Sequence, residues 1–186
     1  MLNRLDDALF SRGLAWTEYR ARIEKNQDIL DEVYEKPAFT DDDLVVLRHM
    51  PPVTVVAIGE DWCPDVFHTL PTWVRVAEAL EGWTCLIFPR DENTELMDGF
   101  LNESRAKRIP VYAFYDRNRS LQCWWSGRCR HAQEQIDAVT GGRSYEEMDD
   151  ASRRKTAAIL SEGYPARYRR ENFEEILTIL RAFFHV

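Results

Sequence analysis

The residue best placed for chemistry in this 186-residue chain is a cysteine that opens a predicted helix. Cys63 stands in the segment Trp62-Cys63-Pro64-Asp65, directly after a short apolar run. Pro64 indicates that the helix begins here, because proline at the first helical position has no N–H to leave unpaired. Unpaired backbone N–H groups and the positive helix end favour a thiolate, whereas the negative Asp65 opposes it. We therefore predict that Cys63 is a reactive nucleophile.

The other three cysteines form no recognisable site on their own. Cys85 lies in the middle of an apolar run, which predicts a core position. Cys123, Cys129 and His131 are spaced C-x5-C-x-H, which is not a standard zinc-ligand spacing, so we predict no metal site. Four cysteines without regular spacing do not indicate a disulfide framework, and we expect reduced thiols.

Short apolar runs and helical periodicities predict the elements that position Cys63. The predicted strands are 53–58, 84–88, 111–115 and 121–125. The predicted helices are 15–34, one beginning at 41, 63–80, 91–102, 130–139, 144–160 and a last one after a break at 163–165. The order of the central elements predicts a parallel βαβ half followed by a hairpin, which gives an α/β fold with a mixed sheet flanked by helices.

No low-complexity linker divides the chain. We predict an N-terminal helical extension over 1–51, a core over 52–140 and a C-terminal helical extension over 141–186. Because no repeat or linker separates them, we expect the extensions to pack on the core as a single structural domain.

Charge and hydropathy exclude two classes of partner. The net charge of -8 would repel a nucleic-acid backbone or an anionic membrane, so we predict that neither is a partner. The longest apolar run, 53–58, is far too short to span a bilayer. The first residues lack the apolar stretch of a signal peptide, which predicts a cytoplasmic protein.

Four features in the same order resemble the thioredoxin superfamily. Trp62-Cys63 resembles the tryptophan and nucleophilic cysteine of its active-site loop, and Pro71 resembles the proline that kinks its active-site helix. Ile109-Pro110 resembles its cis-proline segment, and Gly127 follows the last strand as a family glycine does. In detail the chain is similar to a bacterial subfamily with helical extensions and a WCGD-type loop. The resemblance implies a thioredoxin-like fold over 52–140, with Trp62, Pro64, Ile109 and Pro110 contacting a substrate beside Cys63.

The sequence departs from that family at two positions. Val66 replaces the second cysteine of Cys-x-x-Cys, and Ala57 replaces a buried aspartate that transfers protons. A mixed disulfide on Cys63 would then need an external thiol, such as glutathione, or a distant cysteine to resolve it. The resemblance places the loop after Gly127 near the active-site helix, which makes Cys129 a candidate resolving thiol, with flanking arginines that would favour its thiolate.

Three functions fit these residues. The first is a monothiol thiol–disulfide oxidoreductase in which Cys63 attacks a protein or small disulfide substrate without a required cofactor. The main alternative is a non-catalytic module that binds peptides through the thioredoxin-like groove. A third is a scaffold that holds an iron–sulfur cluster between two subunits through Cys63 and glutathione. Substrate, reductant and oligomeric state do not follow from the sequence.

Overall fold

A computed structural model describes residues 3–100 and 108–186 of the chain. Its centre is a four-stranded sheet with β1 (Thr54–Gly59), β2 (Thr84–Pro89), β3 (Val111–Tyr115) and β4 (Leu121–Ser126). The strand order is β2-β1-β3-β4. β1 and β2 are parallel, whereas β3 is antiparallel to both β1 and β4. The predicted α/β fold with a parallel half and a hairpin is confirmed.

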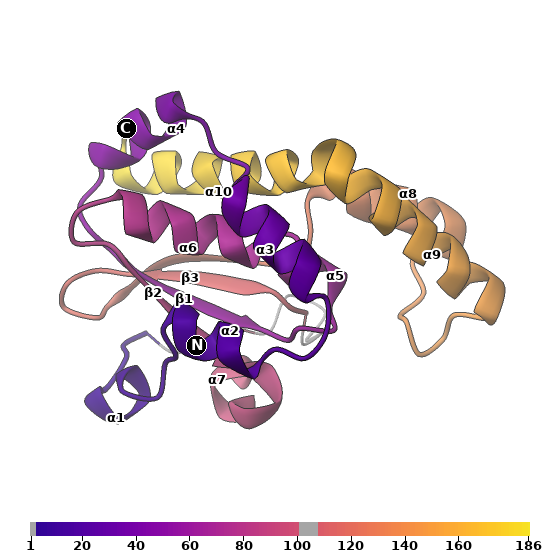
Figure 1. Cartoon of the computed structure of the whole chain (residues 1–186), viewed down its shortest axis with the longest axis horizontal. Helices are drawn as coiled ribbons and strands as arrows, with labels where there is room; N and C mark the ends of the chain where they lie inside the picture. The colour runs from indigo at the N-terminus through magenta and orange to yellow at the C-terminus, as the bar shows by residue number, and fades with distance from the viewer. Residues whose placement is uncertain (1–2, 101–107) are drawn as a thin grey trace.

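Helices cover both faces of this sheet (Figure 1). α3 (Gln27–Glu35), α6 (Leu70–Ala79) and α10 (Arg169–Phe184) lie on one side. α1 (Asp7–Phe10), α2 (Trp16–Arg22) and α7 (Thr94–Asp98) lie on the other side. α8 (Arg130–Thr140) and α9 (Asp150–Gly163) extend beyond the sheet at one end. The remaining helical elements are α4 (Asp41–Arg48), α5 (Pro64–Phe67), the 3-10 turn η1 (Arg90–Glu92) and the π-helix η2 (Tyr164–Tyr168).

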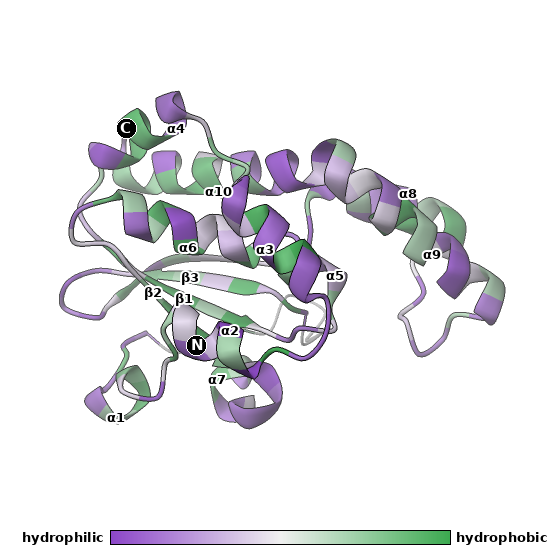
Figure 2. Ribbon diagram, in the orientation of Figure 1, coloured by the Kyte–Doolittle hydropathy of each residue, from purple (hydrophilic) through white to green (hydrophobic). Residues whose placement is uncertain are grey.

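The buried apolar side chains form two clusters. The large one surrounds the sheet and takes residues from both ends of the chain, as Leu30, Val56 and Leu180 illustrate. The small one lies between α8, α9 and η2 and includes Cys129, Ile136 and Tyr164. Apolar and polar stripes alternate around the outer helices in Figure 2, which is the pattern expected of helices that bury one face.

Two predicted helices are each divided in the structure. The predicted helix 15–34 is α2 and α3, separated by a turn in which Asn26 has a φ of 55°. The predicted helix 63–80 is α5 and α6, separated at His68 and Thr69. The Thr69 hydroxyl donates to the Asp65 carbonyl and lies 2.7 Å from the Tyr112 hydroxyl. At this break the Thr69 side chain thus provides the Asp65 carbonyl with a hydrogen-bond donor, which a backbone N–H provides inside a continuous helix.

The C-terminal helices differ from the prediction in where α9 begins and in the absence of a predicted break. α9 begins at Asp150 rather than near Ser144, because the Asp149 side chain caps it by accepting from the Ser152 N–H at 2.7 Å. The predicted break at 163–165 is absent, and η2 joins α9 to α10. Because Gly163 has no side chain, the Tyr168 ring can pack against it. A Cβ at this position would lie 1.9 Å from that ring. Of the predicted helix 91–102, the structure has η1 and α7, and residues 101 and 102 lie outside the described residues.

The register of the sheet brings four loops to one edge. Ile58 of β1 pairs with Val111 of β3, and Val111 pairs with Ser126 of β4. The loop after β1, the segment before β3 and the loop after β4 therefore meet. β2 is parallel to β1, so its end at Pro89 reaches the same edge.

Candidate functional site

Cys63 lies at this edge, at the N-cap of α5. Its backbone is extended, with φ −88° and ψ 121°, and Pro64 occupies the first turn of the helix as predicted. The side chain is buried, with 7% of the residue exposed. Its Sγ lies 3.8 Å from the Ile109 carbonyl oxygen, and the Ile109–Pro110 peptide bond is cis. The structure thus brings Cys63 and the predicted Ile109-Pro110 segment together.

Burial dominates the electrostatics of this thiol. Burial first, and then the charge of Asp65, raise the pKa of Cys63, which comes to about 12. The backbone N–H groups of Val66 and Asp65 and the cation of Arg128 act in the opposite direction. α5 is only four residues long, so the helix end is too weak to outweigh burial. In the free protein Cys63 is therefore a thiol rather than a thiolate at neutral pH.

The carboxylate of Asp65, two residues after Cys63, is buried, which its place in the sequence does not indicate. Asp65 is 1% exposed, and each of its oxygens has a partner. The Arg128 guanidinium donates to Oδ2 at 2.6 and 3.1 Å, and the Tyr164 hydroxyl donates to Oδ1 at 2.5 Å. Burial nevertheless raises the pKa of Asp65. The expectation that Arg128 favours a thiolate on Cys129 has to be corrected, because its guanidinium is committed to Asp65.

The same network continues through a histidine at the end of α5. His68 is buried and stacks on Tyr164, with ring centroids 4.5 Å apart. Its Nδ1 lies 3.1 and 3.2 Å from the Arg169 guanidinium, which also pairs with Glu32 of α3 at 2.9 Å. Burial and then Arg169 lower the pKa of His68 to about 3, so the ring is neutral. His68 is a core residue that joins both helical extensions to the end of α5.

The remaining predicted site residues differ in exposure. Trp62 is 45% exposed, and the Arg90 guanidinium lies 4.9 Å from its ring centroid. Pro64 is half-buried, whereas Ile109 and Pro110 are buried. Only Trp62 of this group offers a large free surface to a substrate, and the binding roles of all four residues stay predictions.

Val66 occupies the position of the missing second cysteine and is 1% exposed. It packs so closely on β1 that a Cβ at Gly59 would lie 2.7 Å from its Cγ1. Ala57, at the position of the missing aspartate, is also buried. Both positions are filled by apolar atoms, so neither holds a second thiol or a proton-transferring carboxyl group.

The candidate resolving cysteine lies in different surroundings. Cys129 is fully buried in the small cluster, at the N-cap of α8. Its Sγ lies 3.7 Å from Glu171 Oε2 of α10, and burial raises its pKa to about 12. All four cysteines are free thiols, and Cys85 and Cys123 are half-buried in the sheet. The resolving role of Cys129 stays a prediction.

Within 3–100 and 108–186, no helix combines the length and apolar character that crossing a bilayer requires. In the same ranges, no group of three or more His, Cys, Asp or Glu side chains is arranged to hold a metal ion.

The sheet order, the helix that starts at Cys63 and the facing Ile109-Pro110 segment define a thioredoxin-like protein. A family model described as thioredoxin matches residues 13–140, so the chain belongs to the thioredoxin family. No curated protein matches it.

Two solved structures share the fold. The first is a protein of unknown function from Pseudomonas aeruginosa, with 15% identity, a TM-score of 0.69 and coverage of 96% of this chain and 98% of the other. The second is an HIV epitope-scaffold, with 15% identity, a TM-score of 0.61 and coverage of 94% and 96%. At this identity the likeness concerns the fold, which includes the helical extensions in both cases.

Proposed function

We propose that the protein is a thiol–disulfide oxidoreductase of monothiol type with Cys63 as its nucleophile. The observation that supports this best is the position of the Cys63 Sγ, 3.8 Å from the Ile109 carbonyl, at the sheet edge where the four loops meet. A thiol at a helix start beside the backbone before β3 is suited to attack a disulfide in an extended substrate. The partner we propose is a protein or small disulfide, and the proposed location is the cytoplasm.

The reaction proceeds in two exchanges. Cys63 releases its proton to solvent, and the thiolate attacks one sulfur of the substrate disulfide. The substrate S–S bond breaks, its other sulfur leaves as a thiolate, and a mixed disulfide with Cys63 remains. An external thiolate such as glutathione then attacks the substrate sulfur of this adduct and releases Cys63. No bound cofactor takes part.

The raised pKa of Cys63 predicts the pH dependence of the first step. Below a pKa of about 12, the thiolate fraction rises about tenfold for each pH unit. The rate of mixed-disulfide formation with bis(2-hydroxyethyl) disulfide should therefore rise through pH 6–9 without a plateau. Peptide mass mapping identifies the modified cysteine at each pH.

Variants decide whether Cys63 carries the reaction. Cys63→Ser should abolish turnover with glutathione, whereas Cys123→Ser, which removes a half-buried thiol of similar kind, should keep it. Turnover that survives Cys63→Ser would overturn the proposal, as would adducts that form on the other cysteines and never on Cys63.

A second candidate function is a non-catalytic peptide-binding module. The observation that favours it is the burial of the Cys63 thiol, which keeps it protonated at neutral pH. In that case Cys63→Ser should bind partner peptides as well as the wild type does. A wild type that forms no mixed disulfide at pH 8 over hours would favour this function.

A further inference from the structure

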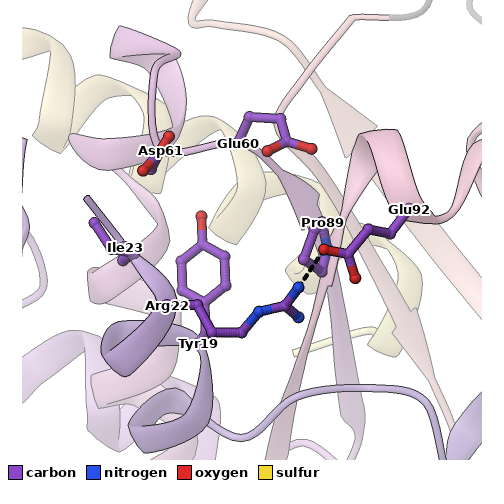
Figure 3. Close-up of a pocket in the computed structure, with 7 residues that line it drawn as sticks. All are labelled: Tyr19, Arg22, Ile23, Glu60, Asp61, Pro89 and Glu92. Atoms are coloured by element: carbon purple, nitrogen blue, oxygen red, sulfur yellow. Dashed lines mark hydrogen bonds and ion pairs between the residues drawn. The ribbon is translucent and has the colours of Figure 1, made fainter. Parts of the chain in front are cut away.

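A small pocket lies beside the Cys63 loop and between α2 and the end of β2. Its volume is about 110 Å³. This volume is well above what a single water needs, so the space accommodates a small polar group. The residues that line it are Tyr19, Arg22, Ile23, Glu60, Asp61, Pro89 and Glu92 (Figure 3).

Tyr19 presents an unsatisfied polar atom at this pocket. The residue is 4% exposed, and its hydroxyl is buried without a hydrogen-bond partner among the described residues. Figure 3 shows the hydroxyl pointing toward Glu60 and Asp61. A buried hydroxyl without a partner costs free energy, which a bound polar group would recover.

Within the described part of the chain, the two carboxylates near this hydroxyl form no ion pair. Glu60 accepts from the Asp91 backbone N–H at 2.8 Å, and Asp61 accepts from two backbone N–H groups at 3.2 Å. The guanidinium groups of Arg22, which lines the pocket, and of Arg90 are paired with other carboxylates. Arg22 pairs with Glu92, and Arg90 pairs with Asp91 and covers the Trp62 ring.

We propose that this pocket binds a primary ammonium group. An ammonium has three donors, and the Tyr19 oxygen and the carboxylates of Glu60 and Asp61 supply three acceptors. The volume fits the aminomethyl end of a lysine side chain or a small free amine. The acidic residues alone would not define a site, but the buried, unpartnered hydroxyl aimed at them does.

The pocket is lined by the loop that leads into Cys63, which gives the site a role in substrate choice. The Cys63 N–H donates to the Glu60 carbonyl at 3.1 Å, so Glu60 and Asp61 belong to the turn that ends at Cys63. An ammonium anchored there would hold a neighbouring disulfide beside Cys63. This selection rests on the proposed exchange chemistry, whereas the binding of the ammonium does not.

Binding is tested in the Cys63→Ser protein, where no exchange can occur. Backbone NMR shifts are followed at Ile23, Asp61 and Glu92 during titration with Nα-acetyl-lysine methylamide, its Nε-acetylated form and n-butylamine. We expect saturable shifts with the free amines and none with the Nε-acetylated form. Saturation by the lysine derivative and not by butylamine would identify a side-chain site, and the reverse would identify a small-amine site. Absence of saturation by both would overturn the proposal.

Variants separate a built site from general attraction to an acidic protein. Glu60→Gln and Tyr19→Phe should each weaken the affinity for the lysine derivative by about tenfold. Tyr19→Phe should leave the thermal midpoint unchanged or raised, because it removes an unpaired hydroxyl. Glu24→Gln removes the same charge from an exposed neighbour outside the pocket and should change affinity little. Equal effects of Glu60→Gln and Glu24→Gln would overturn the site.

The link to exchange is tested with cystamine and bis(2-hydroxyethyl) disulfide, which differ in the ammonium. In each exchange the Cys63 thiolate attacks one sulfur, and the other sulfur leaves as a thiolate. The ratio of the two rates should fall about tenfold in Glu60→Gln relative to wild type. Saturable binding with no exchange would refute the proposed function and leave the site standing. Exchange with a ratio unchanged by the substitution would refute the selection alone.

Discussion

Cys63 and Cys129 occupy the same local position in two different regions. Each is the N-cap of a helix, each is buried, and burial raises the pKa of each to about 12. Cys63 faces a backbone carbonyl at the edge where the sheet loops meet. Cys129 faces the carboxylate of Glu171 inside the small cluster of the outer helices. A position at a helix start therefore does not by itself identify a candidate nucleophile. The groups that face the sulfur distinguish Cys63 from Cys129.

The carboxylates near the two thiols differ just as much. The Asp65 side chain is 2% exposed and its partner Arg128 is 23% exposed. The Glu171 side chain is 23% exposed and its partner Arg167 is 56% exposed. Water screens the second pair far more than the first, so the same kind of substitution should have unequal costs.

The largest expected difference is in stability. Arg128→Met keeps the buried stem and removes the cation that faces Asp65, and we expect it to lower the unfolding free energy by about 3 kcal/mol. Arg167→Met, the matched control at Glu171, should cost less than about 1 kcal/mol. Urea unfolding at pH 7 measures both, and equal losses would remove the distinction between the two regions.

The pH dependence of the Arg128→Met loss has a definite sign. Burial raises the pKa of Asp65 in the folded protein above its unfolded value. The folded state then binds this proton more tightly, so stability rises as pH falls through the folded pKa toward the unfolded one. Arg128→Met removes the cation that lowers this pKa. The unfolding free energy that the substitution costs should therefore be smaller at pH 4–5 than at pH 7. A loss that grows on acidification would contradict this account of Asp65.

A smaller effect is expected when each helix start receives a second cysteine. Val66 and Ala132 stand three residues after Cys63 and Cys129, and both are buried. Val66→Cys should raise insulin reduction by dithiothreitol from near background to several times background, because Cys63 gains an internal partner at the loop edge. Ala132→Cys creates the same spacing inside the small cluster and should leave insulin reduction at background. Activity in Ala132→Cys alone would reverse the comparison.

Local signals in the sequence were sufficient for most of the sheet and for the position of Cys63. The β-branched run of β1 and Pro64 at the helix start are properties of adjacent residues, and β1 and the start of α5 lie within a residue of their predicted positions. The turn at Asn26, which divides the predicted helix 15–34, could not be predicted. Asparagine can adopt a positive φ, but no glycine or proline beside it indicates a turn.

What the sequence could not show depends on distant contacts. Arg128 and Tyr164 are 63 and 99 residues from Asp65, so no spacing rule connects them. Gly163 and Pro165 have the composition of a helix end, yet the packing of the Tyr168 ring over Gly163 accompanies a continuous π-helical segment. Asp65 was interpreted only as a charge that opposes the thiolate, whereas it also ties α5 to the outer helices.

The smallest expected effect concerns a bridge between the two thiols. The Cys129 sulfur lies in the small cluster beside Glu171, whose charge and hydrogen bond both raise its pKa. A disulfide requires Cα atoms within about 7 Å, so a Cys63–Cys129 bridge needs the loop after Gly127 to allow that approach. With diamide at pH 8, we expect a minor, faster band on a non-reducing gel that Cys129→Ser abolishes. Glu171→Gln should strengthen the band, because it removes a negative neighbour and leaves more Cys129 thiolate. Cys85→Ser is the matched control and should leave the band unchanged. If Glu171→Gln yields only intermolecular dimers or glutathione adducts on Cys63, Cys129 is not a resolving thiol, and Cys63 depends on an external thiol alone.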